Sequence, residues 1–256
     1  MEIRILGAHN VESANTRLTS LLVDGVLALD AGALTSSLTF AEQEKISSIL
    51  LTHCHYDHIR DVPAIALNIS YVRKYIKVYA QASTLDALLK HILNNIIYPN
   101  FTERPSERPS LKFHPLEPYR AADVDGYKVV ALPEKHAVPA VGYQINSKEG
   151  KSFFYSGDTG PGLSSCWAHI SPQLLIIDVT MPNGLEEHAI PAGHLTPRLL
   201  GEELAQFKKV KGYLPPVVVI HLATLFENQI REETAQLAKE LGTKITLGHE
   251  GMRLKL

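Results

Sequence analysis

The chain has 256 residues, which is long enough for one large domain with a substantial core. Its hydrophobic fraction of 45% and its charged fraction of 20% are those of an ordinary globular protein. The 25 basic and 27 acidic residues give a formal net charge of -2, so we expect no broad basic surface of the kind that grips a nucleic-acid backbone.

Cysteine usage and hydropathy indicate the compartment. The two cysteines, Cys54 and Cys166, provide no disulfide framework, which fits a reducing cytoplasm. The N-terminus begins as a strand and lacks the apolar core of a signal peptide. No stretch reaches the roughly 18 uninterrupted apolar residues of a membrane span. We therefore expect a cytoplasmic protein with no membrane partner.

In chain order, the first part of the sequence predicts strands and turns that lead into helices. A hairpin is expected across Asp24-Gly25, because this dipeptide is a strong turn signal between two apolar runs. The strands of this part are expected at 3–6, 19–23, 26–30, 49–51 and 78–80. Helices are expected at 40–45, at 58–68 with Pro63 in its first turns, and at 83–93.

The segment 94–110 breaks this pattern. It is rich in proline and charge, and no regular element fits it. Long irregular segments in compact domains are often lids or substrate-binding loops, and a plain surface loop is equally compatible with the composition. We therefore treat 94–110 as a candidate lid or substrate segment.

The second part of the sequence repeats the pattern of strands followed by helices. Strands are expected at 127–132, 141–145, 152–155, 174–178 and 217–220, and a terminal strand pair at 245–247 and 252–256. Helices are expected at 196–207, with Thr196 as N-cap and Pro197 at the first position, and at 227–241. Two sets of mixed strands, each closed by helices, predict two packed sheets with helices on both outer faces. We see no linker, so residues 1–256 form one domain in this interpretation.

The most informative stretch is 53–58, His-Cys-His-Tyr-Asp-His, directly after an apolar run. Imidazole and carboxylate groups are ligands that zinc and similar divalent metals prefer. In an extended segment His53 and His55 point to the same side and can hold one metal, whereas Cys54 faces away. Asp57 and His58 follow where the chain must turn, and can point at a second metal.

Three later residues complete a candidate set of ligands. His136, Asp158 and His221 each lie at or just past the end of an apolar or aromatic run. A strand would deliver such side chains to a site built from loops. Each one alone is typical of an ordinary strand end, but together, and in this order, they indicate a metal site.

The ligand string and its order resemble the metallo-β-lactamase-fold hydrolases along most of the chain. The resemblance implies an α/β (α+β) fold, a four-layer αββα sandwich with the metals at one edge between the sheets. It also implies two divalent metal ions, for which zinc is the default and manganese or iron are alternatives. One ion would be bound by His53, His55, His136 and Asp158. The other would be bound by Asp57, His58, His221 and the same Asp158, which bridges the two ions.

Further motifs are similar to those of the class II 3′,5′-cyclic-nucleotide phosphodiesterases. They are Asp-Thr-Gly-Pro at 158–161, Pro-Asn at 182–183, Gly-His-Leu-Thr-Pro at 193–197 and, more loosely, 91–102. Tyr98 and Asn100 depart from the Trp and Asp of that family. The resemblance implies hydrolysis of cyclic AMP or cyclic GMP to the 5′-nucleotide by a hydroxide that bridges the metals.

The same resemblance suggests roles for further side chains. Besides Asp57 as a catalytic ligand, His194 is the expected general acid, oriented by the carboxylate of Asp178. Asn183 is a candidate contact to phosphate or ribose. Tyr98 and Phe101 are candidates for stacking on a base, because aromatic rings accept any base face.

Two alternatives are weighed against a cyclic-nucleotide phosphodiesterase. Ribonuclease Z shares the first motif and the Ser-Gly-Asp-Thr segment, but its protruding basic arm has no counterpart here. A tRNA or other phosphodiester substrate therefore stays the second choice, behind a small nucleotide. A non-catalytic binding protein is disfavoured, because all seven ligand positions are filled. A homodimer is expected from family habit alone.

Overall fold

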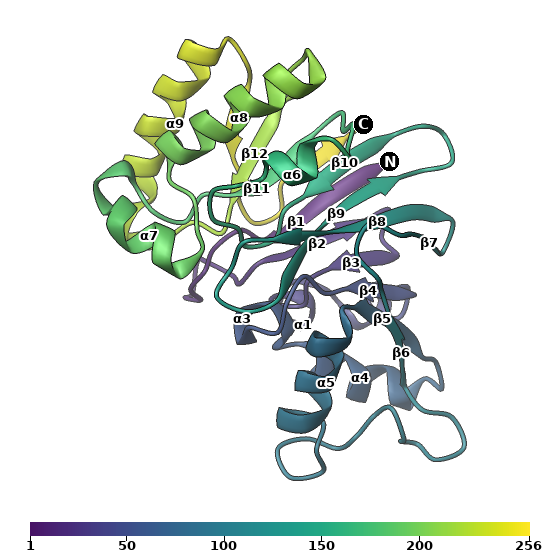
Figure 1. The fold of residues 1–256 in the computed structure, drawn as a ribbon. Helices are drawn as coiled ribbons and strands as arrows, with labels where there is room; N and C mark the ends of the chain where they lie inside the picture. Colours follow the sequence, from purple (N-terminus) through teal and green to yellow (C-terminus); the bar gives the residue numbers. More distant parts are fainter.

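Two seven-stranded β-sheets pack face to face in the computed structural model, which describes residues 1–256 (Figure 1). Both sheets share one plan, in which three antiparallel pairings are followed by three parallel ones. The first sheet has the order β14 (Arg253–Lys255), β1 (Glu2–Gly7), β2 (Ser20–Val23), β3 (Leu27–Leu29), β4 (Ser48–Leu50), β5 (Ile76–Ala80) and β6 (Leu111–Pro115). The second has the order β13 (Ile245–Leu247), β12 (Val217–Ile220), β11 (Leu175–Asp178), β10 (Ser152–Tyr155), β9 (Ala140–Asn146), β8 (Tyr127–Glu134) and β7 (Ala121–Val124).

Helices lie against the outer faces of the sheets (Figure 1). The helices that precede β6 in the chain are α1 (Leu34–Ser37), α2 (Phe40–Gln43), α3 (Tyr56–Ile59), α4 (Val62–Tyr71) and α5 (Ala82–His91). Those that follow β10 are α6 (Ser164–Trp167), α7 (Glu186–Ala192), α8 (Pro197–Lys211) and α9 (Glu227–Leu241), with the short 3-10 helices η1 (Asn183–Leu185) and η2 (Thr224–Phe226). This order confirms the predicted αββα sandwich.

Three apolar clusters hold the layers together. One lies between the first sheet and α4 and α5, and includes Ile65 and Val78. One lies between the two sheets and joins side chains such as Ile5 and Tyr143. The third packs Trp167 against the second sheet and α8. Strands with alternate side chains in two different clusters are buried on both faces, which explains their nearly continuous apolar sequences.

The structure corrects two of the predicted elements. The helix expected at 58–68 is interrupted, because the peptide N–H of Asp61 bonds to Ala31 and Asp61 becomes the N-cap of α4. The expected terminal strand pair is wrong: β13 pairs with β12 in the second sheet, whereas β14 pairs with β1 in the first. Both errors come from partners distant in sequence.

Several short elements were not expected from the sequence. They are α1, α6, α7, β6 and β7, none of which exceeds seven residues. Such lengths leave too few residues for a periodic pattern to stand out. The predicted hairpin, the Thr196 N-cap and Pro197 in the first turn of α8 are confirmed.

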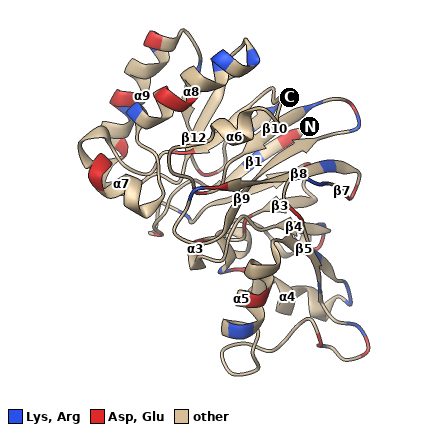
Figure 2. Ribbon diagram, in the orientation of Figure 1, with Lys and Arg blue, Asp and Glu red and all other residues tan.

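Charged residues of both signs occur over the whole framework (Figure 2). Acidic and basic positions are interspersed along the ribbon, with a basic group at the C-terminal end of α8 and acidic positions on α7 (Figure 2). None of the helices is long and apolar enough to cross a membrane.

Candidate metal centre

The predicted ligands meet at one edge of the sandwich, between the sheets. His53 follows β4 of the first sheet, while Asp158 and His221 follow β10 and β12 of the second. Strands β10, β11 and β12 are parallel, so their carboxyl ends reach the same edge. His136 follows β8, which runs in the same direction because two antiparallel pairings separate it from β10.

The side chains form two ligand groups that share one carboxylate. The ligand atoms within each group lie within 4.8 Å of one another. The first group is His53, His55, His136 and Asp158, and the second is Asp57, His58, His221 and Asp158. In the second group, His221 Nε2 lies 3.2 Å from Asp57 Oδ2 and 3.3 Å from Asp158 Oδ2. Ligands on a tetrahedral zinc with bonds of roughly 2.1 Å would be about 3.4 Å apart, so these spacings fit a metal.

Buried polar atoms without hydrogen bonds support the same interpretation. The Nε2 atoms of His53 and His58 and Oδ1 of Asp158 are buried and have no hydrogen-bond partner. An unsatisfied buried polar atom is costly, and a divalent cation among these atoms would remove that cost. The donor set of imidazoles and carboxylates therefore fits a divalent metal on this chain's own geometry.

A buried network around Asp30 orients the imidazoles from the first sheet. Asp30 is fully buried and accepts hydrogen bonds from the Thr52 hydroxyl and from His58 Nδ1 at 2.8 Å. The Thr52 oxygen in turn lies 2.9 Å from His53 Nδ1. With both Nδ1 atoms as donors, the lone pair of each imidazole is on Nε2, the atom directed at the metal position. Tyr155 donates to the same carboxylate.

The backbone carbonyl of Gly193 orients His136 in the same way. His136 Nδ1 donates to Gly193 O at 3.0 Å, which leaves Nε2 available as a ligand atom. Gly193 has a φ of 76°, and a Cβ there would come within 2.7 Å of His136 Cα. Glycine is therefore required both for the backbone conformation and for the close approach.

Thr180 connects the ligand His221 to the neighbouring pair of Asp178 and His194. His221 Nδ1 lies 2.7 Å from Thr180 Oγ1, and the Thr180 hydroxyl donates to Asp178 Oδ1. The other oxygen of Asp178 accepts a hydrogen bond of 2.8 Å from His194 Nδ1. The Nε2 edge of His194 is thus left free, and the ring stacks on His221 with centroids 5.1 Å apart.

The carboxylates control which imidazoles carry protons in the metal-free chain. Burial lowers the pKa of His194, but the adjacent Asp178 outweighs it and raises that pKa to about 9. For His58, burial is likewise outweighed by Asp158 and Asp30, and its pKa lies well above the usual range. Burial lowers the pKa of His53. Because metals and protons compete for the same lone pairs, a bound cation would take the place of the proton on His58.

A cavity of about 660 Å³ opens over the centre. Its lining includes the candidate ligands His55, Asp57, Asp158 and His221, together with His194. The other lining residues come from the loop between β1 and β2 and from the region of α3. His194 and members of both ligand groups therefore line one shared space.

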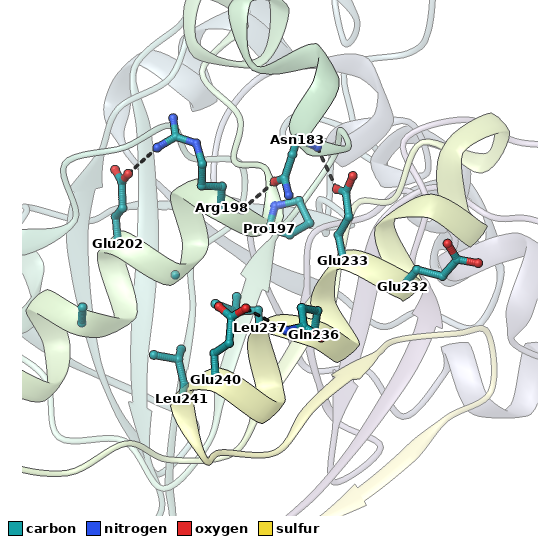
Figure 3. Close-up of a pocket in the computed structure, with 12 residues that line it drawn as sticks. Asn183, Pro197, Arg198, Glu202, Glu232, Glu233, Gln236, Leu237, Glu240 and Leu241 are labelled. Carbon is teal, nitrogen blue, oxygen red and sulfur yellow. Dashed lines mark hydrogen bonds and ion pairs between the residues drawn. The ribbon is translucent and has the colours of Figure 1, made fainter.

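Asn183, predicted to contact substrate, lies elsewhere. Its side-chain oxygen accepts a hydrogen bond from the peptide N–H of Arg198, and its own peptide N–H donates to Glu233 (Figure 3). It lines a separate cavity of about 620 Å³ between α8 and α9. The side-chain oxygen supports the first turn of α8, so we do not retain Asn183 as a substrate contact.

Tyr98 and Phe101 are also placed away from the centre. Phe101 is 5% exposed and packs in the cluster under α4 and α5, and Tyr98 packs against the same cluster. Neither ring lines the cavity over the metal centre, nor does any other residue of 94–110. The buried ring of Phe101 offers no face to a base, and the half-buried ring of Tyr98 lies outside this cavity, so neither residue is placed to stack on a substrate bound there.

Sequence reasoning missed the residues that orient the ligands. Asp30 and Thr180 each follow or end an apolar strand, as Asp158 does, so their position carried a usable signal. Thr52 directly precedes the first motif. The signal was overlooked because a hydrogen bond to an imidazole leaves no spacing pattern in the sequence.

Two helix-covered sheets, with histidine groups sharing a carboxylate at one edge between them, define a metal-dependent hydrolase of the metallo-β-lactamase fold. The chain belongs to the beta-lactamase superfamily domain family, whose model matches residues 19–247. That family membership agrees with the donor set described above.

The chain is 24% identical over 261 residues to a probable 3′,5′-cyclic-nucleotide phosphodiesterase of Yersinia pestis, covering 90% of this chain and 75% of that protein. It is 31% identical over 135 residues to ribonuclease Z of Methanococcus maripaludis, covering 48% of this chain and 41% of that protein. The chain thus matches less than half the length of the ribonuclease.

Solved structures show the same fold. The structure of unliganded yeast PDE1 superimposes with a TM-score of 0.85 at 18% identity, covering 100% of this chain and 99% of that one. The short form of human tRNase Z superimposes with a TM-score of 0.72 at 19% identity, covering 100% and 99%. At these identities the similarity concerns the fold.

Proposed function

We propose that this chain is a two-metal phosphodiesterase that hydrolyses 3′,5′-cyclic nucleotides to 5′-nucleotides. The observation that carries the proposal is the shared cavity, which is lined by members of both ligand groups and by His194. The similarity to the Yersinia protein over 90% of this chain supports the choice of a cyclic nucleotide. Two bound divalent ions would lower the pKa of a water molecule and neutralise charge on the phosphate oxygens.

The chain's own residues supply ligand positions and a proton. His53, His55 and His136 would hold one ion, with Asp57, His58 and His221 on the other and Asp158 on both. The buried partners Asp30, Thr180 and Gly193 O fix the rings, so little reorganisation is needed when an ion binds. Such preorganised sites are the basis of electrostatic stabilisation in catalysis.

His194 is the residue we assign as general acid. Cleavage breaks the bond between phosphorus and the 3′-oxygen while a water oxygen bonds to phosphorus, and the departing 3′-oxygen needs a proton. Asp178 holds Nδ1 of His194 and favours its protonated form, so Nε2–H can supply that proton. Asp178 acts as a positioning residue, because it does not reach the cavity.

A substrate panel tests this assignment. The protein loaded with zinc or manganese is incubated with cyclic AMP, cyclic GMP, a tRNA precursor and bis(p-nitrophenyl) phosphate, and metal is measured on the same sample. We expect cleavage of a cyclic nucleotide. Cleavage of the precursor without either cyclic nucleotide would instead favour a nuclease of the ribonuclease Z kind.

The variant His194→Ala separates the general acid from the metals. We expect it to keep its metal content and to lose about 10²–10⁴ in rate. His188→Ala is the matched control, since this exposed histidine of α7 lies outside the cavity. If His194→Ala lost its metal instead, His194 would be a ligand and the general-acid role would be wrong.

A further inference from the structure

The lining of the cavity over the metal centre includes one positively charged side chain, that of Arg60. Asn10, Val11 and Glu12 come from the loop between β1 and β2, and Tyr56 and Arg60 from the region of α3. Arg60 is the only Lys or Arg among the eleven residues that line this cavity. Arg60 is the C-cap of α3, the helical turn that contains the candidate ligands Asp57 and His58, so its place relative to the centre is closely defined.

One edge of the Arg60 guanidinium is held firmly. Nε donates to Asp61 Oδ1 at 3.0 Å, and the side chain of Asp61 is 5% exposed. The other oxygen of Asp61 accepts a hydrogen bond of 2.7 Å from the peptide N–H of Thr35. Asp61 is therefore itself fixed by the backbone of α1, and it sets the direction of the arginine.

The other edge of Arg60 has an exposed partner. Nη1 donates to Glu12, whose side chain is 39% exposed and belongs to a loop in which residues 11–15 are all exposed, and Nη2 makes a long contact of 3.5 Å with Ser36 Oγ. The Arg60 side chain is 17% exposed, so the pair is open to water mainly at its Glu12 end, where water and salt screen it and a long side chain must be ordered. Glu12 is thus the weaker of the two carboxylate partners and can be exchanged for another anion.

Phosphate is the anion that suits this edge. A guanidinium presents parallel N–H donors that match two phosphate oxygens, and such charge-assisted pairs are stronger than neutral hydrogen bonds. We propose, on the basis of the function proposed above, that Arg60 binds a phosphate oxygen of the substrate and that Glu12 occupies this position in the free chain. Glu12 is then a competitor that the substrate displaces, and it sets how strongly the cavity holds phosphate.

Isothermal titration with inorganic phosphate tests this without turnover. The metal-loaded protein is compared with Arg60→Ala, Arg60→Lys and Glu12→Gln. Arg60→Ala is expected to weaken phosphate binding about 10- to 100-fold, the range for a hydrogen bond to a charged group. Arg60→Lys is expected to lie between, because an ammonium cannot bind two oxygens as the fork does. Glu12→Gln is expected to tighten binding about two- to fivefold, because a weak competitor is lost.

Two further variants distinguish binding from a structural role. In the double variant Glu12→Gln with Arg60→Ala, the tightening due to Glu12→Gln should disappear, since the competitor acts through Arg60. Arg17→Ala, which removes a cation from the same loop but outside the cavity, should leave phosphate affinity unchanged. Unchanged affinity in Arg60→Ala, or an equal loss in Arg17→Ala, would overturn the proposal.

Kinetics then show which phosphate Arg60 contacts. If it binds the reacting phosphate, Arg60→Ala raises KM for a cyclic nucleotide and for a dinucleotide with a 5′-phosphate alike. A rise in KM for the dinucleotide alone would show that Arg60 does not bind the phosphate of the cyclic nucleotide and would overturn the proposal. The phosphate titration is independent of the reaction, so a chain that cleaved no cyclic nucleotide but gave the expected titrations would refute the proposed function and leave the role of Arg60 standing.

Discussion

The metal centre and the segment 94–110 both include much irregular backbone. Their side chains differ in which groups surround them. At the centre, imidazoles and carboxylates converge, and buried polar atoms such as His53 Nε2 lack hydrogen bonds. In 94–110, asparagine side chains bond to nearby peptide N–H groups, while Phe101 is buried among apolar side chains. Irregular backbone alone therefore does not mark a site.

The two regions differ in where the hydrogen-bond partners of their polar side chains lie in the chain. Asn94 and Asn100 accept hydrogen bonds from residues two or three positions on, so this segment satisfies itself locally. The ligands of the centre are oriented instead by distant partners: Asp30 and Thr180 bond Nδ1 of His58 and His221 and so direct Nε2 of both rings toward the carboxylates of the centre. A site is recognised by free, oriented and buried donors, which only a ligand would satisfy.

The largest expected effect is at the centre itself. Asp57→Ala should abolish turnover and lower the metal content from about two ions per chain to about one, because the second ligand group loses a carboxylate. Elemental analysis and the substrate assay on one preparation measure both quantities. Asp57 is partly exposed, so a normal melting curve is expected as the control; full metal content with full activity would refute its role as a ligand.

A substitution in the segment 94–110 should change the stability of the protein rather than its catalytic rate. Phe101→Ala removes a buried ring and should lower the free energy of unfolding by about 3–5 kcal/mol. Urea unfolding followed by circular dichroism measures this, with Tyr98→Phe as a control that should change little. The kcat of the folded Phe101→Ala protein should stay as in the wild type. A large fall in kcat with unchanged stability would restore Phe101 as a substrate contact.

Asp30→Asn tests whether distant partners orient the ligands. An amide keeps the size of Asp30 and tolerates its positive φ of 55°, but weakens the bonds to His58 and Thr52. Metal affinity should fall about 10- to 100-fold, as measured by competition with a chelator. Asp125→Asn is the matched control, because Asp125 has a φ of 53° and lies outside both ligand groups. Equal affinities in the two variants would contradict the orienting role.

The smallest effect concerns an imidazole outside the centre. Burial lowers the pKa of His9, but its bonds to Glu250 and Glu227 outweigh this and raise it above 6.5. Burial raises the pKa of Glu250, and its bond to His9 outweighs that and lowers it below 4.5. The His9 contribution is complete below pH 6.5 and is lost as the pH rises through its higher folded pKa. The Glu250 contribution is present above pH 4.5 and is lost as the pH falls through its lower folded pKa.

His9→Gln should therefore cost stability mainly between about pH 4.5 and 6.5. We expect a difference below about 1 kcal/mol, because both glutamates are partly exposed and screened. Denaturant unfolding at several pH values measures it. A difference that grew from neutral to alkaline pH would show that His9 is not protonated in the folded chain.

The sequence by itself determined the fold class and the candidate metal ligands. His53, His55, Asp57 and His58 are close in the chain, and the other ligands lie at strand ends, where parallel strands necessarily bring them to one edge. The hairpin and the Thr196 N-cap also follow from local chemistry. The spacing of ligands in one motif, turn dipeptides and helix caps are local properties, so the sequence expresses them directly.

Only the tertiary structure decided which neighbours those residues meet. Non-local packing decided the hydrogen bond between Asp30 and His58, the burial of Phe101 and the hydrogen bond from the peptide N–H of Arg198 to Asn183. It also decided that β13 and β14 pair in different sheets. The pair of Glu12 and Arg60 spans 48 positions in the chain. Such contacts arise from the closure of the two sheets on each other, and no short-range pattern encodes them.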